Sequence, residues 1–298
     1  MGTSQLHIGN IKIKQVLLLY KKSSYQIHFS PLVTPAYSTI QQGNMARFKK
    51  THLRHFRSLK EIERILKLEG IAYQKANRGT KIDYARYDLV ITVGGDGTLL
   101  EAAGQIKNQF ILGVNSDPFW SVGRLCTATV DNFSVILKNI RRQKTRIQPF
   151  NRMRIQMGNQ SGKIVDALND ILISHKNPAA MSRYSLTIGR IEEEQRSSGI
   201  WISTAAGSTG GIHSAGGKVL PITSQKFQYR PRELYCGFPK TMYRLCGDIV
   251  LPKEIIKVTS LMKDGFIFVD GCHVKFAFPF GAILTVSKSP EPLRALTI

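Results

Sequence analysis

Residues 90–104 read VITVGGDGTLLEAAG. The apolar run at 89–93 ends at two glycines, and Asp96, Gly97 and Thr98 follow before apolar residues return at helical spacing. A short, continuously apolar run bounded by glycine is typical of a strand covered on both faces. The residues that form the apolar stripe of the next helix are Leu99, Ala102, Ala103 and Ile106. The stretch therefore predicts a buried strand, a glycine-rich turn and a helix.

The segments on either side repeat this alternation. Residues 16–20 and 110–114 are further apolar runs, and residues 133–140 carry apolar side chains at helical spacing. Ser58 and Glu61 have the spacing of a capping box, which predicts that a helix begins at Ser58. An order of strand, helix, strand, helix predicts a parallel sheet with right-handed crossovers, covered by helices.

The periodicity changes after about residue 148. Apolar residues then alternate with polar ones, as at 153–157, 186–188, 200–202 and 274–278. This period of two, punctuated by glycine and proline, predicts antiparallel strands. A length of 298 residues favours two domains. We therefore expect an α/β domain with a parallel sheet at residues 1–148, followed by a β-rich, sandwich-like domain at residues 149–298.

The glycine-rich turn lies where an open parallel sheet binds ligands, between a strand end and a helix start. Gly94, Gly95 and Gly97 can adopt φ values barred to other residues and allow phosphate oxygens to approach the backbone. The helix N-terminus adds unpaired N–H groups. Asp96 would repel a phosphate that is only bound, so it fits a site where phosphate is transferred: it can accept a proton from an attacking hydroxyl or help to hold Mg²⁺. The simpler interpretation is that Asp96 caps the helix.

Two common phosphate-binding motifs are absent. A Walker A loop needs Ser or Thr after its lysine, whereas Val219 follows Gly216-Gly217-Lys218. The dinucleotide fingerprint G-x-G-x-x-G fails because Leu100 stands where its third glycine belongs.

A strand, GGDGT and a helix resemble the signature shared by NAD kinases, diacylglycerol and sphingosine kinases and phosphofructokinases. Other segments favour the first family. Residues 203–217, STAAGSTGGIHSAGG, are similar to the STPTGSTAYxxSAGG segment of NAD kinases, and Gly113-Val114-Asn115 is similar to the start of its GINxGxLGFL segment. Asn169-Asp170 stands in the place of its Asn-Glu pair, and Asp270-Gly271 in that of a late Asp-Gly turn.

This resemblance implies transfer of a phosphoryl group from ATP or polyphosphate, with Mg²⁺, to the 2′-hydroxyl of the adenosine ribose of NAD. Asp96 would be the general base, and Gly94, Gly95, Gly97 and Thr98 would bind the transferring phosphate. The residues that would bind the dinucleotide are Asn115, Asn169, Asp170, Ser208 and Thr209. No side chain is assigned as a metal ligand, and a homodimer or homotetramer is expected.

The resemblance departs from the family pattern at three places. Thr209-Gly210-Gly211 replaces Thr-Ala-Tyr, so an aromatic ring beside the substrate is missing, and Ser198 replaces an aspartate. The loop that begins at Asn115 is longer than the family's glycine-rich loop. Phe119 or Trp120 in that loop can supply the missing aromatic surface, or can be a hydrophobic anchor.

The composition adds limits on partners and compartment. The chain has 42 Lys+Arg and 20 Asp+Glu, a net charge of +22, which favours polyanionic ligands. No apolar run reaches the roughly 18 residues of a membrane span. The N-terminal segment reads as part of the fold. The cysteines show no metal or disulfide spacing and predict a reducing compartment, the cytoplasm; they are Cys126, Cys236, Cys246 and Cys272.

Two other functions remain open at this point. One is a kinase with the same GGDGT signature that acts on a different hydroxyl, such as that of a sugar, a nucleoside or a lipid head group. The other is a non-catalytic nucleotide- or RNA-binding relative, which the altered loop and the positive charge would suit. No segment interleaves exposed aromatic and basic residues as RNA-binding sheets do, so no specific nucleic-acid partner is expected.

Overall fold

The computed structural model describes residues 6–8, 11–29, 40–158, 162–237 and 242–297, which divide into two compact units. The first unit comprises residues 1–148 together with 294–298, and the second comprises residues 149–293. The expected α/β domain and β-rich domain are both present, so the predicted fold class is confirmed.

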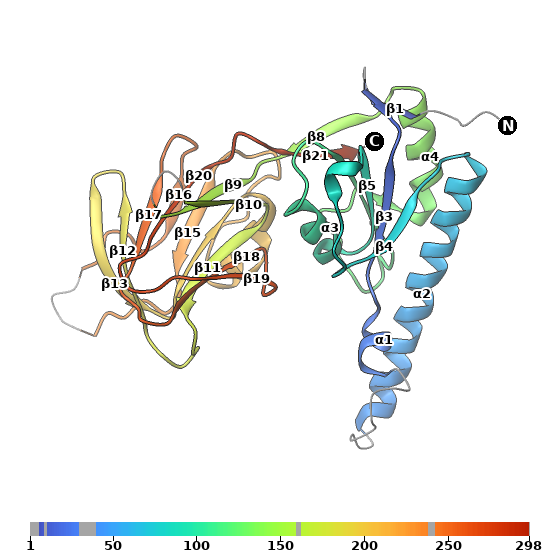
Figure 1. The fold of residues 1–298 in the computed structure, drawn as a ribbon. Helices are drawn as coiled ribbons and strands as arrows, with labels where there is room; N and C mark the ends of the chain where they lie inside the picture. Colours follow the sequence, from blue (N-terminus) through green and yellow to red (C-terminus); the bar gives the residue numbers. More distant parts are fainter. Residues whose placement is uncertain (1–5, 9–10, 30–39, 159–161, 238–241, 298) are drawn as a thin grey trace. The chain divides into compact units, whose positions relative to one another are not determined.

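The main sheet of the first unit is largely parallel (Figure 1). Its strands in spatial order are β4 (Gln74–Asn77), β3 (Val16–Tyr20), β5 (Leu89–Gly94), β6 (Phe110–Asn115), β21 (Leu293–Thr297) and β8 (Arg146–Phe150), with β7 (Ala128–Thr129) paired to β6. A separate hairpin is formed by β1 (Leu6–Ile8) and β2 (Ile11–Ile13). The strands predicted at 16–20, 89–93 and 110–114 are confirmed.

Helices cover both faces of this sheet. One face packs against α2 (Ile40–Leu68) and α4 (Val130–Arg141), in a core that includes Leu18, Ile91 and Leu112. The other face packs against α3 (Asp96–Ala103). The remaining helical segments of this unit are α1 (Ser24–His28) and the 3₁₀ turn η1 (Tyr84–Arg86). Strands buried on both faces explain the continuous apolar runs in the sequence.

The predicted helix start at Ser58 is wrong, because α2 already begins at Ile40. Ser58 therefore lies inside the helix, and its hydroxyl donates a hydrogen bond to the main-chain oxygen of Ser116 (2.8 Å). The pattern of a capping box was present, but residues 45–57 contain no proline or glycine to stop the helix, so α2 continues through it.

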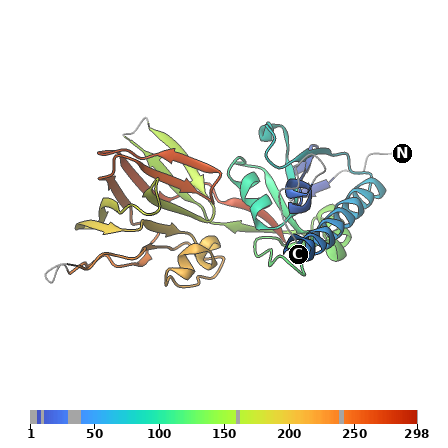
Figure 2. The same ribbon diagram turned by 90° about the horizontal axis from the view of Figure 1, so that it is seen from below.

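The second unit is a sandwich of two antiparallel six-stranded sheets (Figure 2). One sheet has the order β10 (Lys163–Ala167), β9 (Met153–Met157), β20 (Ile283–Lys288), β17 (Ile256–Ser260), β12 (Ser182–Ile188), β13 (Ile191–Ser197). The other has the order β16 (Asp248–Val250), β15 (Phe227–Pro231), β14 (Ile200–Ser203), β11 (Asp170–His175), β18 (Gly265–Val269), β19 (Val274–Ala277). The 3₁₀ turn η2 (Ala206–Thr209) and α5 (Gly211–Ser214) follow β14.

The C-terminal strand contradicts the expected boundary, because residues 294–298 belong to the first unit. Strand β21 pairs with β6 in parallel, with Arg294 opposite Phe110 and Ala295 opposite Ile111. The buried side chain of Leu296 lies in the first unit's core. Sequence periodicity cannot predict that β21 pairs with β6, since a five-residue segment carries no signal that specifies its partner strand.

We expect Leu296→Ala to destabilise the first unit by about 2–5 kcal/mol, the usual loss for a large-to-small change in a core. Leu296 is 0% exposed, whereas Leu68 at the end of α2 is 71% exposed and provides the control. Leu68→Ala should change stability by less than about 0.5 kcal/mol. Urea unfolding of both variants measures the difference, and equal effects would contradict the placement of β21.

Candidate active site

The GGDGT turn joins the carboxyl end of β5 to the first turn of α3. None of Gly94, Gly95 and Gly97 has a positive φ, so the turn does not use the φ values that only glycine can adopt. They are needed for space instead. A Cβ on Gly94 would overlap the hydroxyl of Thr98, and one on Gly95 would lie 2.6 Å from the Ser121 hydroxyl. The turn is thus packed closely by its own surroundings.

Asp96 is the first residue of α3, but its carboxylate does not cap the helix, which has Gly95 at the N-cap and no side-chain cap. Instead, one oxygen accepts a hydrogen bond from the main-chain N–H of Leu125 (2.8 Å) and the other from that of Arg124 (3.0 Å). The carboxylate is partly exposed. A carboxylate offers about four acceptor positions, so these two bonds fix its orientation and leave room for a further donor.

The loop after β6 is fixed by side chains from two elements. Asn115 is buried, donates to the main-chain oxygen of Ser121 (2.8 Å) and accepts from the N–H of Asp117 (3.2 Å). Ser116 is bound from α2, where His55 Nδ1 lies 2.8 Å from its hydroxyl. Asn115 therefore organises the loop in this structure, and its amide is already used inside the unit.

Phe119 and Trp120 are on the surface of this loop, 73% and 54% exposed. Each ring lies under a guanidinium group of α2: Arg54 is 4.6 Å from the Phe119 centroid and Arg47 is 5.9 Å from that of Trp120. The hydrophobic-anchor interpretation is therefore wrong, because both rings remain accessible.

Two cations at this edge of the sheet have no signal in the sequence. Lys21 follows β3 and Arg78 follows β4, and both strands end beside the turn. The Lys21 side chain lies 3.5 Å from the position of a Cβ on Gly94, and the Arg78 guanidinium lies 3.1 Å from that on Gly97. A lysine or arginine after an apolar strand is common in any sequence, so only the sheet order shows that these two adjoin GGDGT.

In the second unit, Asp270 organises the turn that carries the predicted Asn169-Asp170 pair. Its carboxylate accepts hydrogen bonds from three consecutive main-chain N–H groups, those of Leu168 (2.8 Å), Asn169 (2.6 Å) and Asp170 (3.2 Å). Asp270 itself has a positive φ of 49°. The resemblance named Asp270 only as part of a turn. In the structure, Asp270 binds the main chain of Asn169 and Asp170 and so fixes where this pair lies.

Asn169 and Asp170 each carry a polar group in an unusual environment. The side-chain oxygen of Asn169 is buried and has no hydrogen-bond partner in the described part of the chain. Burial, and secondarily the charge of Asp270, raises the pKa of Asp170 to about 7. The Asp170 carboxylate lies 3.4 Å from the position of a Cβ on Gly210, so the pair adjoins the segment after β14.

That segment holds the two remaining predicted residues, in different environments. Ser208 is buried: its hydroxyl donates to the main-chain oxygen of Ala205 (2.8 Å) and accepts from the N–H of Leu220 (3.0 Å). It therefore joins two stretches of backbone rather than lining a surface, contrary to the expectation. Thr209 is exposed.

Trp201 explains the absence of a tyrosine at position 211. A Cβ on Gly211 would lie 2.7 Å from the indole ring, so this partly exposed side chain of β14 occupies the space where a side chain at 211 would begin. The second unit thus has an aromatic ring beside Gly210-Gly211, supplied from a neighbouring strand.

Comparison with curated proteins places these features in a family. The chain is 35% identical over 231 residues to a protein from Oryza sativa subsp. japonica named "Probable NADH kinase", with 70% of each chain covered. It is 32% identical over 308 residues to the "NADH kinase" of Arabidopsis thaliana, with 95% of each chain covered. The protein belongs to the NAD kinase family. A scan against protein-family models found no match.

Solved structures of NAD kinases share the fold. The NAD kinase of Archaeoglobus fulgidus in complex with ATP has a TM-score of 0.65 at 24% identity, covering 95% of this chain and 93% of that one. The yeast NADH kinase complexed with NADH has a TM-score of 0.69 at 14% identity, covering 96% and 84%. Both similarities concern the architecture of this NAD kinase family member.

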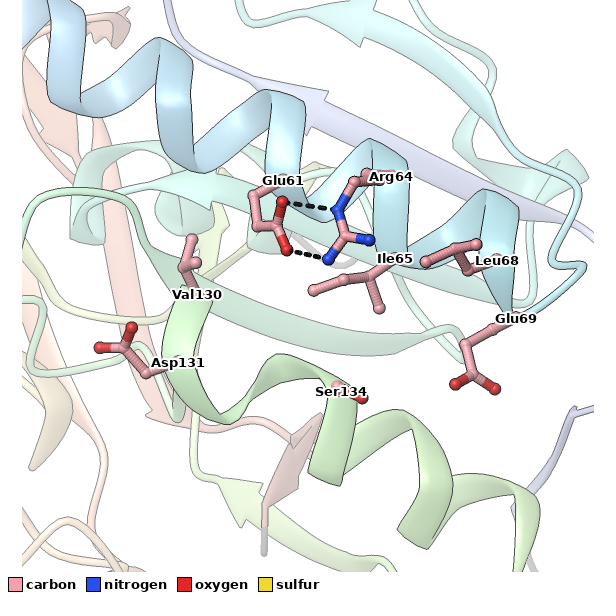
Figure 3. A pocket seen from close by; sticks show the side chains of 8 residues that line it. All are labelled: Glu61, Arg64, Ile65, Leu68, Glu69, Val130, Asp131 and Ser134. Carbon is pink, nitrogen blue, oxygen red and sulfur yellow. Dashed lines mark hydrogen bonds and ion pairs between the residues drawn. The ribbon is translucent and has the colours of Figure 1, made fainter.

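The first unit also has a cavity of about 330 Å³ between α2 and α4 (Figure 3). It contains none of the predicted site residues. Its charged side chains are three carboxylates, Glu61, Glu69 and Asp131, and one guanidinium, Arg64, which is paired with Glu61. A net negative lining does not suit a phosphorylated ligand of a NAD kinase family member.

We expect Gly113→Ala to disturb Asp96 indirectly. A Cβ on Gly113 would lie 2.7 Å from Leu99 and 3.0 Å from the main chain of Cys126, next to the N–H of Leu125 that holds the carboxylate. Overpacking of this kind costs about 1–3 kcal/mol. Gly104→Ala is the control, because a Cβ there makes only ordinary contacts at 3.7 Å. Thermal unfolding measures both, and equal stability would contradict the close packing described.

The raised pKa of Asp170 predicts a pH-dependent stability. Folding favours its neutral form, so the stability it contributes is present below its unfolded pKa of 3.8 and is lost as the pH rises towards about 7. Asp170→Asn should therefore gain melting temperature relative to the parent between pH 4 and pH 7, and no further above that. The exposed Asp264→Asn is the control. A difference that does not vary with pH would show that Asp170 ionises normally.

Proposed function

We propose that this protein is a kinase that transfers a phosphoryl group from ATP to the 2′-hydroxyl of the adenosine ribose of NAD or NADH. Membership of the NAD kinase family supports the reaction class. The observation that carries the assignment to residues is the Asp96 carboxylate, oriented by two main-chain N–H groups at a glycine turn that can receive phosphate.

In the proposed reaction, Asp96 accepts the proton of the ribose 2′-hydroxyl. The 2′-oxygen then bonds to the γ-phosphorus of ATP, the bond to the bridging oxygen breaks, and ADP leaves. Phosphoryl transfer depends chiefly on positioning and on neutralising charge. The two N–H groups that hold Asp96 fix its direction, and the N-terminus of α3, with Thr98 in its first turn, would bind the phosphate.

The second unit is proposed to bind the adenosine portion. The unpartnered oxygen of Asn169 suits a donor such as the amino group of adenine, and the carboxylate of Asp170 suits a ribose hydroxyl. Thr209 is exposed and remains a proposed contact, whereas Ser208 and Asn115 act through the backbone that they hold.

NAD and NADH are both candidate phosphoryl acceptors, and both should be assayed. The two plant relatives are named NADH kinases, while archaeal relatives such as that of Methanoregula boonei are named NAD kinases. ATP is the proposed donor because the Archaeoglobus fulgidus structure contains it, and polyphosphate is the second donor. An assay of NAD and NADH with both donors separates these four combinations.

Magnesium is proposed to arrive bound to the donor phosphates. Such an ion usually takes few protein ligands, and within the described ranges no cluster of three His, Cys, Asp or Glu side chains could hold a metal by itself. It would neutralise charge on the phosphates, and the partly exposed Asp96 would be the carboxylate to approach it.

Two further expectations from the sequence are retained as proposals. Self-association as a homodimer or homotetramer is measured by light scattering. A reducing compartment such as the cytoplasm agrees with four cysteines that are all free thiols. None of the helices in the described ranges is long and apolar enough to span a membrane.

Family membership favours NAD over the alternative acceptors, and a substrate panel with labelled ATP tests it. Labelled product from a sugar, a nucleoside or a lipid, with none from NAD or NADH, would establish the alternative kinase. Binding of RNA that weakens steeply with salt, without any turnover, would establish the non-catalytic alternative.

Asp96→Asn should lower the kcat for NADP formation by about 10²–10⁴-fold, since it removes the proton acceptor and, with a single amide oxygen, also loses one of the two main-chain hydrogen bonds that orient the side chain. Asp131→Asn is the control, because Asp131 is an exposed aspartate in the first turn of α4 in the same unit. Its turnover should equal that of the parent. A coupled assay of NADP, with circular dichroism to verify folding, measures both, and an Asp96 variant at the parent rate would exclude Asp96 as the base.

A further inference from the structure

The carboxyl ends of four neighbouring strands lie in a row in the first unit. In spatial order, β4, β3, β5 and β6 end at or just before Arg78, Lys21, the GGDGT turn and Asn115. The main-chain N–H of Arg78 donates to the oxygen of Tyr20 (2.7 Å), which ties the ends of β4 and β3 together. Two cations therefore stand side by side immediately next to the glycine turn.

Lys21 lies against the turn itself. Its methylene chain is in van der Waals contact with the space above Gly94, at 3.5 Å from a Cβ built there. The neighbouring hydroxyl of Thr98 is buried and without a hydrogen-bond partner in the described part of the chain. Lys21 is partly exposed, and among the described residues no hydrogen bond or ion pair holds its ammonium group. The Lys21 side chain and the Thr98 hydroxyl thus both adjoin Gly94, and neither polar group has a hydrogen-bond partner among the described residues.

The backbone of Lys21 is fixed by a buried histidine of α2. His55 Nε2 lies 3.0 Å from the main-chain oxygen of Lys21, and because that oxygen can only accept, Nε2 carries the proton. His55 Nδ1 then accepts from the Ser116 hydroxyl at 2.8 Å. Burial, aided by the charge of Lys21, lowers the pKa of His55 to about 4, so it is neutral at pH 7. It positions Lys21 without adding charge.

Arg78 is aimed at the turn by Glu101 of α3. Glu101 accepts from Arg78 Nε (2.7 Å) and from the N–H of Gly79 (2.6 Å). This bond leaves the terminal nitrogens of the guanidinium available, and one of them is 3.1 Å from the position of a Cβ on Gly97. Glu101 thus binds the Nε side of the Arg78 guanidinium, and a terminal nitrogen of the same group lies next to Gly97.

The pair is electrostatically costly as it stands. Burial lowers the pKa of Lys21, the carboxylate of Asp117 raises it, and the charge of Arg78 lowers it again. Asp117 is shared, because it also pairs with Arg54 at 3.7 Å. Other charged or titratable groups facing this region are Asp96, Glu101 and Cys126. A multiply charged anion would offset the repulsion between the two cations.

We propose that Lys21 and Arg78 bind the phosphate chain of the phosphoryl donor, with Lys21 on the phosphate that is transferred. This assignment rests on the proposed function and names two of its ligands. The chemistry recognised is a linear chain of phosphates, which a nucleoside triphosphate and inorganic polyphosphate share. Lys21 stabilises charge as it develops on the transferred group, and Arg78 fixes the chain next to it.

The primary test is Lys21→Met, which keeps the methylene packing on Gly94 and removes the charge. We expect kcat for NADP formation to fall by about 10²–10³-fold, as for loss of one contact to developing charge, with KM for NAD changed by less than about twofold. Lys22→Met is the control: Lys22 is the next residue and is exposed, and its variant should match the parent. Lys21→Arg should restore part of the rate.

A second measurement does not depend on turnover. Inorganic tripolyphosphate should raise the melting temperature of the parent, and this shift should be lost in Lys21→Met and reduced in Arg78→Met. Equal losses with ATP and with tripolyphosphate support recognition of the phosphate chain. If the rise in melting temperature were lost with ATP but kept with tripolyphosphate, Lys21 and Arg78 would bind the nucleoside part, and the proposal would be overturned.

The outcomes separate this inference from the proposed function. A Lys21→Met variant that phosphorylates NAD at the parent rate, or that tripolyphosphate stabilises as well as the parent, overturns the inference and leaves the function standing. A parent that does not phosphorylate NAD or NADH, but whose stabilisation by tripolyphosphate requires Lys21, overturns the function and supports the phosphate site. If Lys21→Met does not fold, Lys21→Gln and Arg78→Met give the same comparison.

Discussion

The first unit depends on close approach between the GGDGT backbone and the segments around it. With no Cβ at positions 94, 95 and 97, the hydroxyls of Thr98 and Ser121 and the guanidinium of Arg78 come within a distance that any side chain would block. That compactness brings residues 124 and 125 near enough to donate their N–H groups to Asp96. The Asp96 carboxylate is stabilised there by these two N–H donors, and the cations Lys21 and Arg78 lie beside the same turn.

In the second unit, a carboxylate orders the backbone of a turn. The Asp270 carboxylate accepts hydrogen bonds from three consecutive N–H groups, and these bonds hold the backbone of 168–170 in one conformation. The side-chain oxygen of Asn169 is then buried without a hydrogen-bond partner in the described part of the chain, and Asp170 follows it with a raised pKa. Burial of Asp170, with a smaller contribution from the charge of Asp270, raises the pKa of Asp170 to about 7.

Several features could be predicted because a local pattern causes them. The continuous apolar runs of β3, β5 and β6 require burial on both faces, and the alternation in β9, β12 and β14 requires one buried face. Other predictions from local patterns were wrong because contacts between residues far apart in the sequence determined the structure. Ser58 had the pattern of a cap but bonds to Ser116 from inside α2, and Phe119 and Trp120 remain exposed under Arg54 and Arg47.

The sequence by itself determined the order of the two units, the strand and helix on either side of GGDGT, and the chemistry available at Asp96. These follow from the spacing of apolar residues and from the glycines, which act over a few neighbouring positions. Only the tertiary structure decided that β21 returns to the first sheet, that Ser208 is internal, and that Lys21 and Arg78 adjoin the turn. These depend on which strands become neighbours, and strand order arises from packing between residues far apart in the chain.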